Sequence, residues 1–158
     1  MAWLRGKTDI AGRLVVVAGA GRMGSALAHS AAGAGADVVI ASRDTQRASR
    51  LARLYSGRGV DLSVGAELAS AAAGVVVALG GPWAELHQFS ESALPPIADI
   101  SAPTSVPEDV RRRLNGGFLG IDDLYRRSAP LPGAYIEDAE RVIARKTAEY
   151  AAWLERAG

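Results

Sequence analysis

Three glycines stand at the spacing G-x-G-x-x-G in the segment 19–24. The segment follows Leu14–Ala18, a short apolar run rich in β-branched residues that is typical of a buried parallel strand. An alanine-rich helical pattern comes after it, over 25–32. Strand, glycine turn and helix in this order predict a site for the pyrophosphate of a dinucleotide, because the helix offers free N–H groups and the positive end of its dipole to an anion. The alternative is a strand–helix turn that binds nothing.

Each glycine of this turn has a task of its own. Gly19 permits the tight turn, Gly21 lets the backbone approach the pyrophosphate without a Cβ in the way, and Gly24 allows the helix to pack closely on the strand. We expect the helix to begin near Arg22 and the whole segment to contact the dinucleotide. Its residues are Gly19, Ala20, Gly21, Arg22, Met23 and Gly24.

The end of the second predicted strand, 38–41, distinguishes the two nicotinamide cofactors. Domains that prefer NAD usually place Asp or Glu there, to bind the ribose hydroxyls. This chain has Ser42 and Arg43 instead, with Arg47 one helical turn further. A guanidinium can stack on adenine and pair with a 2′-phosphate, so these residues predict NADP(H) unless the arginines are only solvated surface. Asp44 is included in the predicted site, although its position suits the cap of the next helix better.

Few residues point to a reaction. His87 lies in a predicted short helix over 83–89, while Asp99 and Ser101 come at the end of a predicted strand whose carboxyl edge should face the nicotinamide. These three residues are the candidates for catalysis. The alternatives are a surface histidine and an aspartate that binds backbone groups in its own turn. The remaining predicted cofactor contacts follow the fourth and fifth strands, at Leu79, Gly80, Gly81, Pro82, Ser101, Ala102 and Pro103.

Strand and helix signals alternate along most of the chain. Strands are expected at 14–18, 38–41, 60–62, 74–79, 97–100 and 117–120. Helices are expected at 25–32, 44–55, 66–72, 83–89, 107–114 and 122–127. This alternation predicts an α/β fold with a Rossmann-type, doubly wound parallel sheet. We place this NADP-binding domain at residues 1–130 and a C-terminal helix at 131–158.

The C-terminal segment 135–156 contains no Gly or Pro after the break at 128–133. Its apolar residues recur at roughly helical spacing, at Ile136, Ala139, Val142, Ile143, Tyr150, Trp153 and Leu154. The pattern predicts a long helix that either packs on its own sheet or extends to a partner chain. The second arrangement predicts a homodimer formed through this helix.

The composition limits the classes of function. With 18 Lys and Arg against 17 Asp and Glu, the net charge of +1 lacks the broad positive field of a nucleic-acid binder, so direct nucleic-acid binding is not expected. The chain has no cysteine, which excludes disulfides, thiolate metal ligands and cysteine nucleophiles. No metal-ligand constellation is present. No apolar run reaches the roughly 18 residues of a membrane span, and we expect a cytoplasmic protein.

The run VVVAGAGRMGSALAHSAAGAGADVVIASRDTQRASRLA resembles the NADP-binding domains of glutamyl-tRNA reductase and shikimate dehydrogenase in its glycine turn and its Ser-Arg ending. Part of the deazaflavin-dependent NADP reductase family shares the Ser-Arg-Asp ending and is similar at 81–83. The segments 98–103, 106–110 and 120–124 resemble glutamyl-tRNA reductase in order and spacing, and 135–156 is similar to the start of its spinal helix.

The resemblance implies an NADP(H)-dependent reductase component. In the glutamyl-tRNA reductase family, a preceding catalytic domain carries a cysteine that forms a thioester, and neither has a counterpart in this sequence. The family's Ser-Ser-Thr-Gly is replaced at 78–81 by Ala-Leu-Gly-Gly. We therefore expect an activated carbonyl to come from a separate catalytic or carrier protein, or to be bound at a dimer interface. The alternative is a non-catalytic, NADP(H)-binding regulatory or scaffolding protein.

Overall fold

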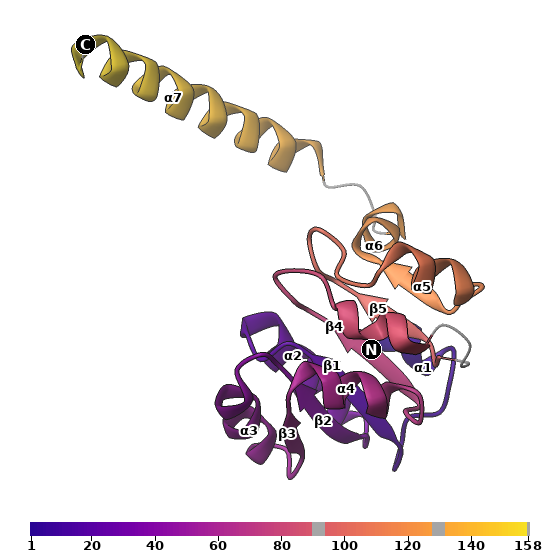
Figure 1. Cartoon of the computed structure of the whole chain (residues 1–158). Helices are drawn as coiled ribbons and strands as arrows, with labels where there is room; N and C mark the ends of the chain where they lie inside the picture. Colours follow the sequence, from indigo (N-terminus) through magenta and orange to yellow (C-terminus); the bar gives the residue numbers. More distant parts are fainter. Residues whose placement is uncertain (90–93, 128–131, 158) are drawn as a thin grey trace. The chain divides into compact units, whose positions relative to one another are not determined.

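The computed structural model describes residues 1–89, 94–127 and 132–157. Its described strands form one parallel sheet in the order β3-β2-β1-β4-β5-β6 (Figure 1). The strands are β1 (Leu14–Ala18), β2 (Asp37–Ala41), β3 (Arg58–Val60), β4 (Gly74–Val77), β5 (Ile97–Asp99) and β6 (Phe118–Gly120). This is the strand order of a doubly wound dinucleotide-binding sheet, so the predicted fold class is confirmed.

The strand register brings the carboxyl ends of the central strands to the same level. Ala18 at the end of β1 lies opposite Ala41 of β2 and Val77 of β4, and Val77 in turn lies opposite Asp99 of β5. The chain passes from β1 outward to β2 and β3, and returns to β4 on the other side of β1. Ligands bind in the crevice at such a switch point, at the carboxyl ends of the strands.

Helices cover both faces of the sheet. The helical segments are α1 (Ala2–Arg5), α2 (Arg22–Gly33), α3 (Thr45–Arg53), α4 (Leu62–Ala69), the 3₁₀ helix η1 (Ala84–Phe89), α5 (Glu108–Arg113), α6 (Ile121–Arg127) and α7 (Gly133–Ala157). Val15 and Val17 of β1 pack into the apolar cluster that includes buried residues of α1, α2 and α3. Val16 and Ala18 point to the opposite cluster, which includes residues of α4, η1 and α5. This alternation follows from the two-residue period of a strand.

The helix after the glycine turn begins at Arg22, as predicted from the turn, because Gly21 is extended and its carbonyl accepts the Ser25 N–H at 2.9 Å. The alanine-rich pattern over 25–32 is the later part of this helix. The strand predicted at 60–62 lies at Arg58–Val60 instead. Its last residues are displaced because Asp61 caps α4, accepting the N–H of Val64 at 2.9 Å. That hydrogen bond, followed by one from Ser63, lowers the pKa of Asp61.

The chain divides into two units, Met1–Arg126 and Arg127–Gly158. The second unit contains α7, a continuous helix of 25 residues (Figure 1). The predicted domain boundary between residues 130 and 131 lies outside the described residues. Within the described part of the chain, no helix is both long and apolar enough to cross a membrane.

Candidate dinucleotide-binding site

The glycine turn combines two crowded positions with one open position. Gly19 has a φ of +119°, and a Cβ there would collide with the backbone carbonyl of Ala78. A Cβ on Gly24 would collide with the carbonyl of Gly19, so this glycine lets α2 sit close to the turn. Gly21 differs, because a Cβ on it would meet no protein atom within 4 Å. The protein's own packing therefore leaves the space beside Gly21 open.

The N-terminus of α2 has the geometry and the free amide groups that can bind an anion. Gly21 is the N-cap residue and has no side chain with which to cap the first turn. The first amides of a helix have no partner within the helix, and together with the helix dipole they favour a negatively charged group. The open space beside Gly21 lets such a group approach the backbone directly.

A cavity of about 480 Å³ lies where the carboxyl ends of β1, β4 and β5 meet. It is lined by Gly21, Arg22, Met23, Ala78, Leu79, Gly80, Ile100, Ser101 and Ala102. The cavity brings together three segments predicted from the sequence to contact a cofactor: the glycine turn, the segment after β4 and the segment after β5. Arg22 is the one ionisable residue among these lining residues. The volume of the cavity is in the range of small-molecule and cofactor sites.

Arg43 connects the segment after β2 with the segment after β4. Its guanidinium donates a hydrogen bond to the carbonyl oxygen of Pro82 at 3.2 Å. A Cβ on Gly81 would lie 3.5 Å and 3.7 Å from the two terminal nitrogens of Arg43, so the guanidinium rests directly against this glycine. Both Arg43 and Arg47 are exposed, and neither forms an ion pair among the described residues.

The other two residues at this end of β2 have local partners. The Ser42 hydroxyl oxygen accepts the N–H of Asp44 at 3.2 Å. The Asp44 carboxylate accepts the N–H of Arg47 at 2.8 Å and caps α3, as its position in the sequence indicates. Because its carboxylate is used in this way, Asp44 is less suited than Arg43 to contact a cofactor. Ser42, Arg43, Asp44, Arg47, Gly81, Pro82 and Pro103 lie outside the lining of the cavity.

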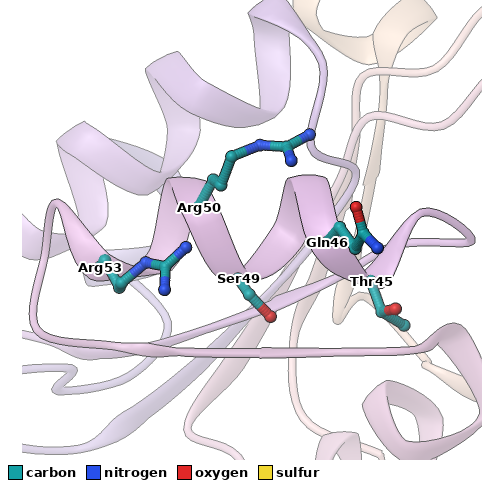
Figure 2. Close-up of a pocket in the computed structure, with 5 residues that line it drawn as sticks. All are labelled: Thr45, Gln46, Ser49, Arg50 and Arg53. Atoms are coloured by element: carbon teal, nitrogen blue, oxygen red, sulfur yellow. The ribbon is translucent and has the colours of Figure 1, made fainter.

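A second hollow of about 300 Å³ lies along α3 (Figure 2). All the residues that line it come from this helix: Thr45, Gln46, Ser49, Arg50 and Arg53. None of them belongs to the cofactor site predicted from the sequence. Arg50 is exposed and forms no ion pair among the residues described, so it offers a matched comparison for the arginines at the end of β2.

Asp99 organises the loop after β5. The side chain is fully buried, and its two carboxylate oxygens accept backbone N–H groups from Ser101 at 2.9 Å, Ser105 at 2.7 Å and Val106 at 2.9 Å. The structure thus favours the alternative in which Asp99 binds the backbone of its own turn. Asp99 does not line the cavity, and its contacts are those of a positioning residue.

Ser101 joins the two segments that form the far wall of the cavity. Its hydroxyl oxygen accepts the N–H of Leu79 at 3.0 Å, and the residue is buried. His87 lies elsewhere, because η1 places its Nδ1 3.2 Å from the Asp109 carboxylate on α5, with both side chains about half exposed. Partial desolvation raises the pKa of Asp109, but the hydrogen bond and charge of His87 outweigh it, so this pKa is lowered. His87 is therefore a surface residue outside the cavity.

Trp83 was not identified as a site residue from the sequence. Its side chain is fully buried, and the indole Nε1 donates to the carbonyl of Leu62 at 3.1 Å. Its backbone N–H donates to the carbonyl of Ser105 at 2.8 Å. Trp83 thereby fixes the segment after β4 between α4 and the loop that Asp99 holds. The feature of the sequence that could have indicated this role is a tryptophan directly after a Gly-Gly-Pro break at the end of a buried strand.

Comparison with known proteins places this arrangement in a family. Residues 13–98 match the family described as NADP oxidoreductase, coenzyme F420-dependent. Over 92% of its length, the chain is 34% identical to a glutamyl-tRNA reductase of Rubrobacter xylanophilus, of which it covers 37%. The chain spans about a third of the length of the curated relatives it matches.

Solved structures share the fold. The glutamyl-tRNA reductase of Methanopyrus kandleri matches with a TM-score of 0.61 at 23% identity, over 98% of this chain and 42% of that one. The nucleotide-binding domain of the Thermoplasma volcanium glutamyl-tRNA reductase matches with a TM-score of 0.56 at 15% identity, over 91% of both chains. The resemblance to glutamyl-tRNA reductase inferred from the sequence is confirmed. Because the family match extends over more than half of its residues, the chain belongs to the oxidoreductase family described as NADP oxidoreductase, coenzyme F420-dependent.

Proposed function

We propose that this chain is an NADPH-dependent reductase component, which binds NADPH across the carboxyl ends of β1, β2 and β4 and reduces an activated carbonyl. The carbonyl is supplied by a partner protein or at a dimer interface. The observation that carries the proposal is the pair of exposed arginines at the end of β2, Arg43 and Arg47, where a domain that prefers NAD usually has an acid.

The residues present fit NADPH at two separate points. The pyrophosphate fits the open space beside Gly21, where the first amides of α2 would bind it. The 2′-phosphate fits Arg43, whose guanidinium donates, among the described residues, to the neutral carbonyl of Pro82. A hydrogen bond from guanidinium to phosphate is charge-assisted and roughly twice as strong as one between neutral groups, so exchange of the carbonyl for the phosphate would be favoured.

The cavity fits the nicotinamide end of the cofactor. NADPH, when bound, supplies the hydride. Met23, Leu79 and Ile100 contribute apolar groups to the wall, which can exclude water from the reacting carbon. The Ser101 hydroxyl and the Leu79 amide bind each other and hold the wall in place. The chain's contribution under this proposal is binding, orientation and exclusion of water.

The lining of the cavity supports a reaction that needs a second component. The described residues that line it include no Asp, Glu, His, Lys or Tyr, and the chain contains no cysteine. The thiol that holds an acyl group as a thioester must then come from another molecule, and the proton for the reduced carbonyl from that molecule or from water. A thioester carbonyl is a better hydride acceptor than an ordinary ester, and this fits the resemblance to glutamyl-tRNA reductase.

The same lining favours a second function, a non-catalytic NADP(H)-binding protein whose contacts with a partner depend on the cofactor. All three residues considered for catalysis lie outside the cavity or bind other protein groups. His87 is on the surface, Asp99 binds its own loop, and Ser101 binds Leu79. This alternative predicts cofactor binding without turnover on any carbonyl substrate.

One experiment separates the two functions. NADPH oxidation is followed with the full chain and a small acyl thioester, beside the matching oxygen ester. The proposal expects measurable oxidation with the thioester that exceeds the rate with the ester and is lost in a Gly21→Val variant. Tight NADPH binding with no oxidation of either compound would support the non-catalytic protein. Failure to bind NADPH at all would overturn both.

A further inference from the structure

The helix α7 carries a continuous apolar stripe, which the proposed function does not explain. Its large apolar side chains are 47–65% exposed: Tyr135, Ile136, Val142, Ile143, Tyr150, Trp153 and Leu154. At about 100° per residue, all of them fall within an arc of about 120° on the helix surface. Folded proteins rarely leave so large an apolar surface in water, and a stripe of this width is typical of a helix that packs against another helix.

The stripe has the seven-residue period of a coiled coil. Ile136, Ile143 and Tyr150 recur at intervals of seven and correspond to the first core position of the repeat. Ala139, Lys146 and Trp153 follow each of them by three residues and correspond to the second core position. A helix packed on a sheet does not require this period, whereas a helix paired along its length with another helix does.

We propose that α7 pairs with α7 of a second copy of this chain as an antiparallel coiled coil. In this register Ile136 lies opposite Trp153 of the second copy, and Ala139 lies opposite Tyr150 of the second copy. Ile143 lies opposite Lys146 of the second copy, and the twofold axis passes between residues 144 and 145.

The sizes of the core residues favour the antiparallel direction. A parallel pair in register would place Ala139 against Ala139 and leave a gap, while Trp153 would meet Trp153 and crowd the other end. The antiparallel pair matches the smallest core residue with Tyr150, which suits the close packing of protein interiors. The rings of Tyr150 and Trp153 are already stacked, with centroids 5.9 Å apart and planes 20° apart, and form a flat surface for this contact.

The charges on α7 favour the same direction. Residues 133–144 carry Glu137, Asp138 and Glu140 against Arg141 alone. Residues 145–157 carry Arg145, Lys146 and Arg156 against Glu149 and Glu155. An antiparallel pair places the acidic half of each helix beside the basic half of the other, whereas a parallel pair places the two acidic halves together. Two halves of like net charge repel each other when they lie side by side, and this can set the orientation of the pair.

Lys146 is compatible with a core position. Its ammonium nitrogen lies 2.6 Å from the Glu149 carboxylate, and Arg145 lies 3.8 Å from the same side chain. The Lys146 stem can therefore cover Ile143 of the second copy while its charge stays at the edge of the interface. A polar residue at one core position also specifies register, at some cost in stability.

The absence of native cysteine makes a direct test of direction practical. Single variants Ala139→Cys and Tyr150→Cys of the full chain are purified, then oxidised separately and as an equimolar mixture. The proposal expects cross-linked dimers mainly in the mixture, in which each dimer contains one chain of each variant. Strong cross-linking of Ala139→Cys with itself indicates a parallel pair and overturns the proposed arrangement, as does the lack of cross-linking in all three samples.

The mass of the protein tests the interface itself. Light scattering on the full chain at micromolar concentration should give a dimer, and Ile143→Glu should weaken the dimer at least tenfold. The matched control is Ala148→Glu, which lies about 180° from the centre of the stripe at 100° per residue and should leave the dimer intact. Circular dichroism checks that both variants keep their helix. A monomeric unmodified chain, or equal effects of the two substitutions, overturns the proposal.

Discussion

The guanidinium of Arg43 donates a hydrogen bond to the carbonyl oxygen of Pro82 at 3.2 Å, although 39 residues separate them in the sequence. The contact joins the ends of β2 and β4, the two strands that flank β1. It places the residue that would recognise a 2′-phosphate next to the segment that forms the wall of the cavity. Arg43 would thus bind the adenosine end of the cofactor and also contact the segment that shapes the site for the nicotinamide end.

Arg43→Ala should remove most of the preference for NADPH. We expect the unmodified chain to bind NADPH at least about tenfold more tightly than NADH, which is about 1.4 kcal/mol, because Ser42 and Arg43 replace the usual acid. In the variant, NADPH affinity should fall by about that factor while NADH affinity changes little. Calorimetric titration with both cofactors measures this.

Arg50→Ala is the matched control, because Arg50 lines the hollow along α3 shown in Figure 2 and is not predicted to contact the cofactor. It removes the same charge from the helix that follows Arg43 and should leave the NADPH preference in place. Equal affinities of the unmodified chain for NADPH and NADH would contradict the assignment. Equal losses in the two variants would indicate a general effect of charge.

Gly21→Ala and Gly24→Ala should separate binding from stability. A methyl group on Gly21 meets no protein atom, so this variant should unfold at nearly the normal temperature and bind NADPH at least tenfold more weakly. A methyl group on Gly24 collides with the carbonyl of Gly19, so that variant should lose about 2 kcal/mol of unfolding free energy. Thermal unfolding and titration with NADPH measure both quantities. A Gly21→Ala variant with unchanged affinity would exclude a close approach of the cofactor at this position.

Asp99→Asn should destabilise the fold. The Asp99 carboxylate accepts three backbone N–H groups in a fully buried position, and one oxygen of it accepts two of them. An amide replaces one of these oxygens with a donor and leaves buried N–H groups without an acceptor, which costs about 1–3 kcal/mol. Urea unfolding measures the loss, and Asp37→Asn, at an exposed residue, is the control. Equal unfolding free energies for Asp99→Asn and Asp37→Asn would show that the Asp99 carboxylate does not stabilise the loop after β5.

The sequence was sufficient to predict the features that depend on neighbouring residues. The run Leu14–Ala18, the spacing of Gly19, Gly21 and Gly24, and the cap at Asp44 are all local patterns, and the structure places β1, the turn and α3 accordingly. The roughly helical spacing of the apolar residues in 135–156 likewise indicated a long helix. Local periodicity and capping chemistry are visible in a single sequence because the interacting groups lie within a few residues.

The features that depend on how loops fold could not be decided from the sequence, which left two roles open for Asp99. Asp99 binds groups two, six and seven residues ahead, so its role depends on the path of the loop after β5. Trp83 is buried against Leu62, 21 residues away, and its importance for the segment after β4 could not be seen from its neighbours. His87 finds Asp109 on another helix by the same kind of long-range contact. Asp99 and Trp83 support segments that line the cavity, whereas His87 lies outside it.

The full chain, tested alone, should not reduce glutamyl-tRNA at a steady rate. Reduction of an acyl ester to an aldehyde is helped by prior transfer of the acyl group to a thiol, and this chain has no cysteine to accept it. Arg22 is the one ionisable side chain among the described residues that line the cavity, so none of them offers a carboxylate, imidazole or amine to move a proton. A net charge of +1 also gives little general attraction for a polyanion.

The assay follows NADPH consumption with charged tRNA, first with this chain alone and then with a thiol-bearing acyl enzyme added. Turnover should require the second protein and should be lost in Gly21→Val. Steady turnover by this chain alone would contradict the account and would require direct hydride transfer to the ester.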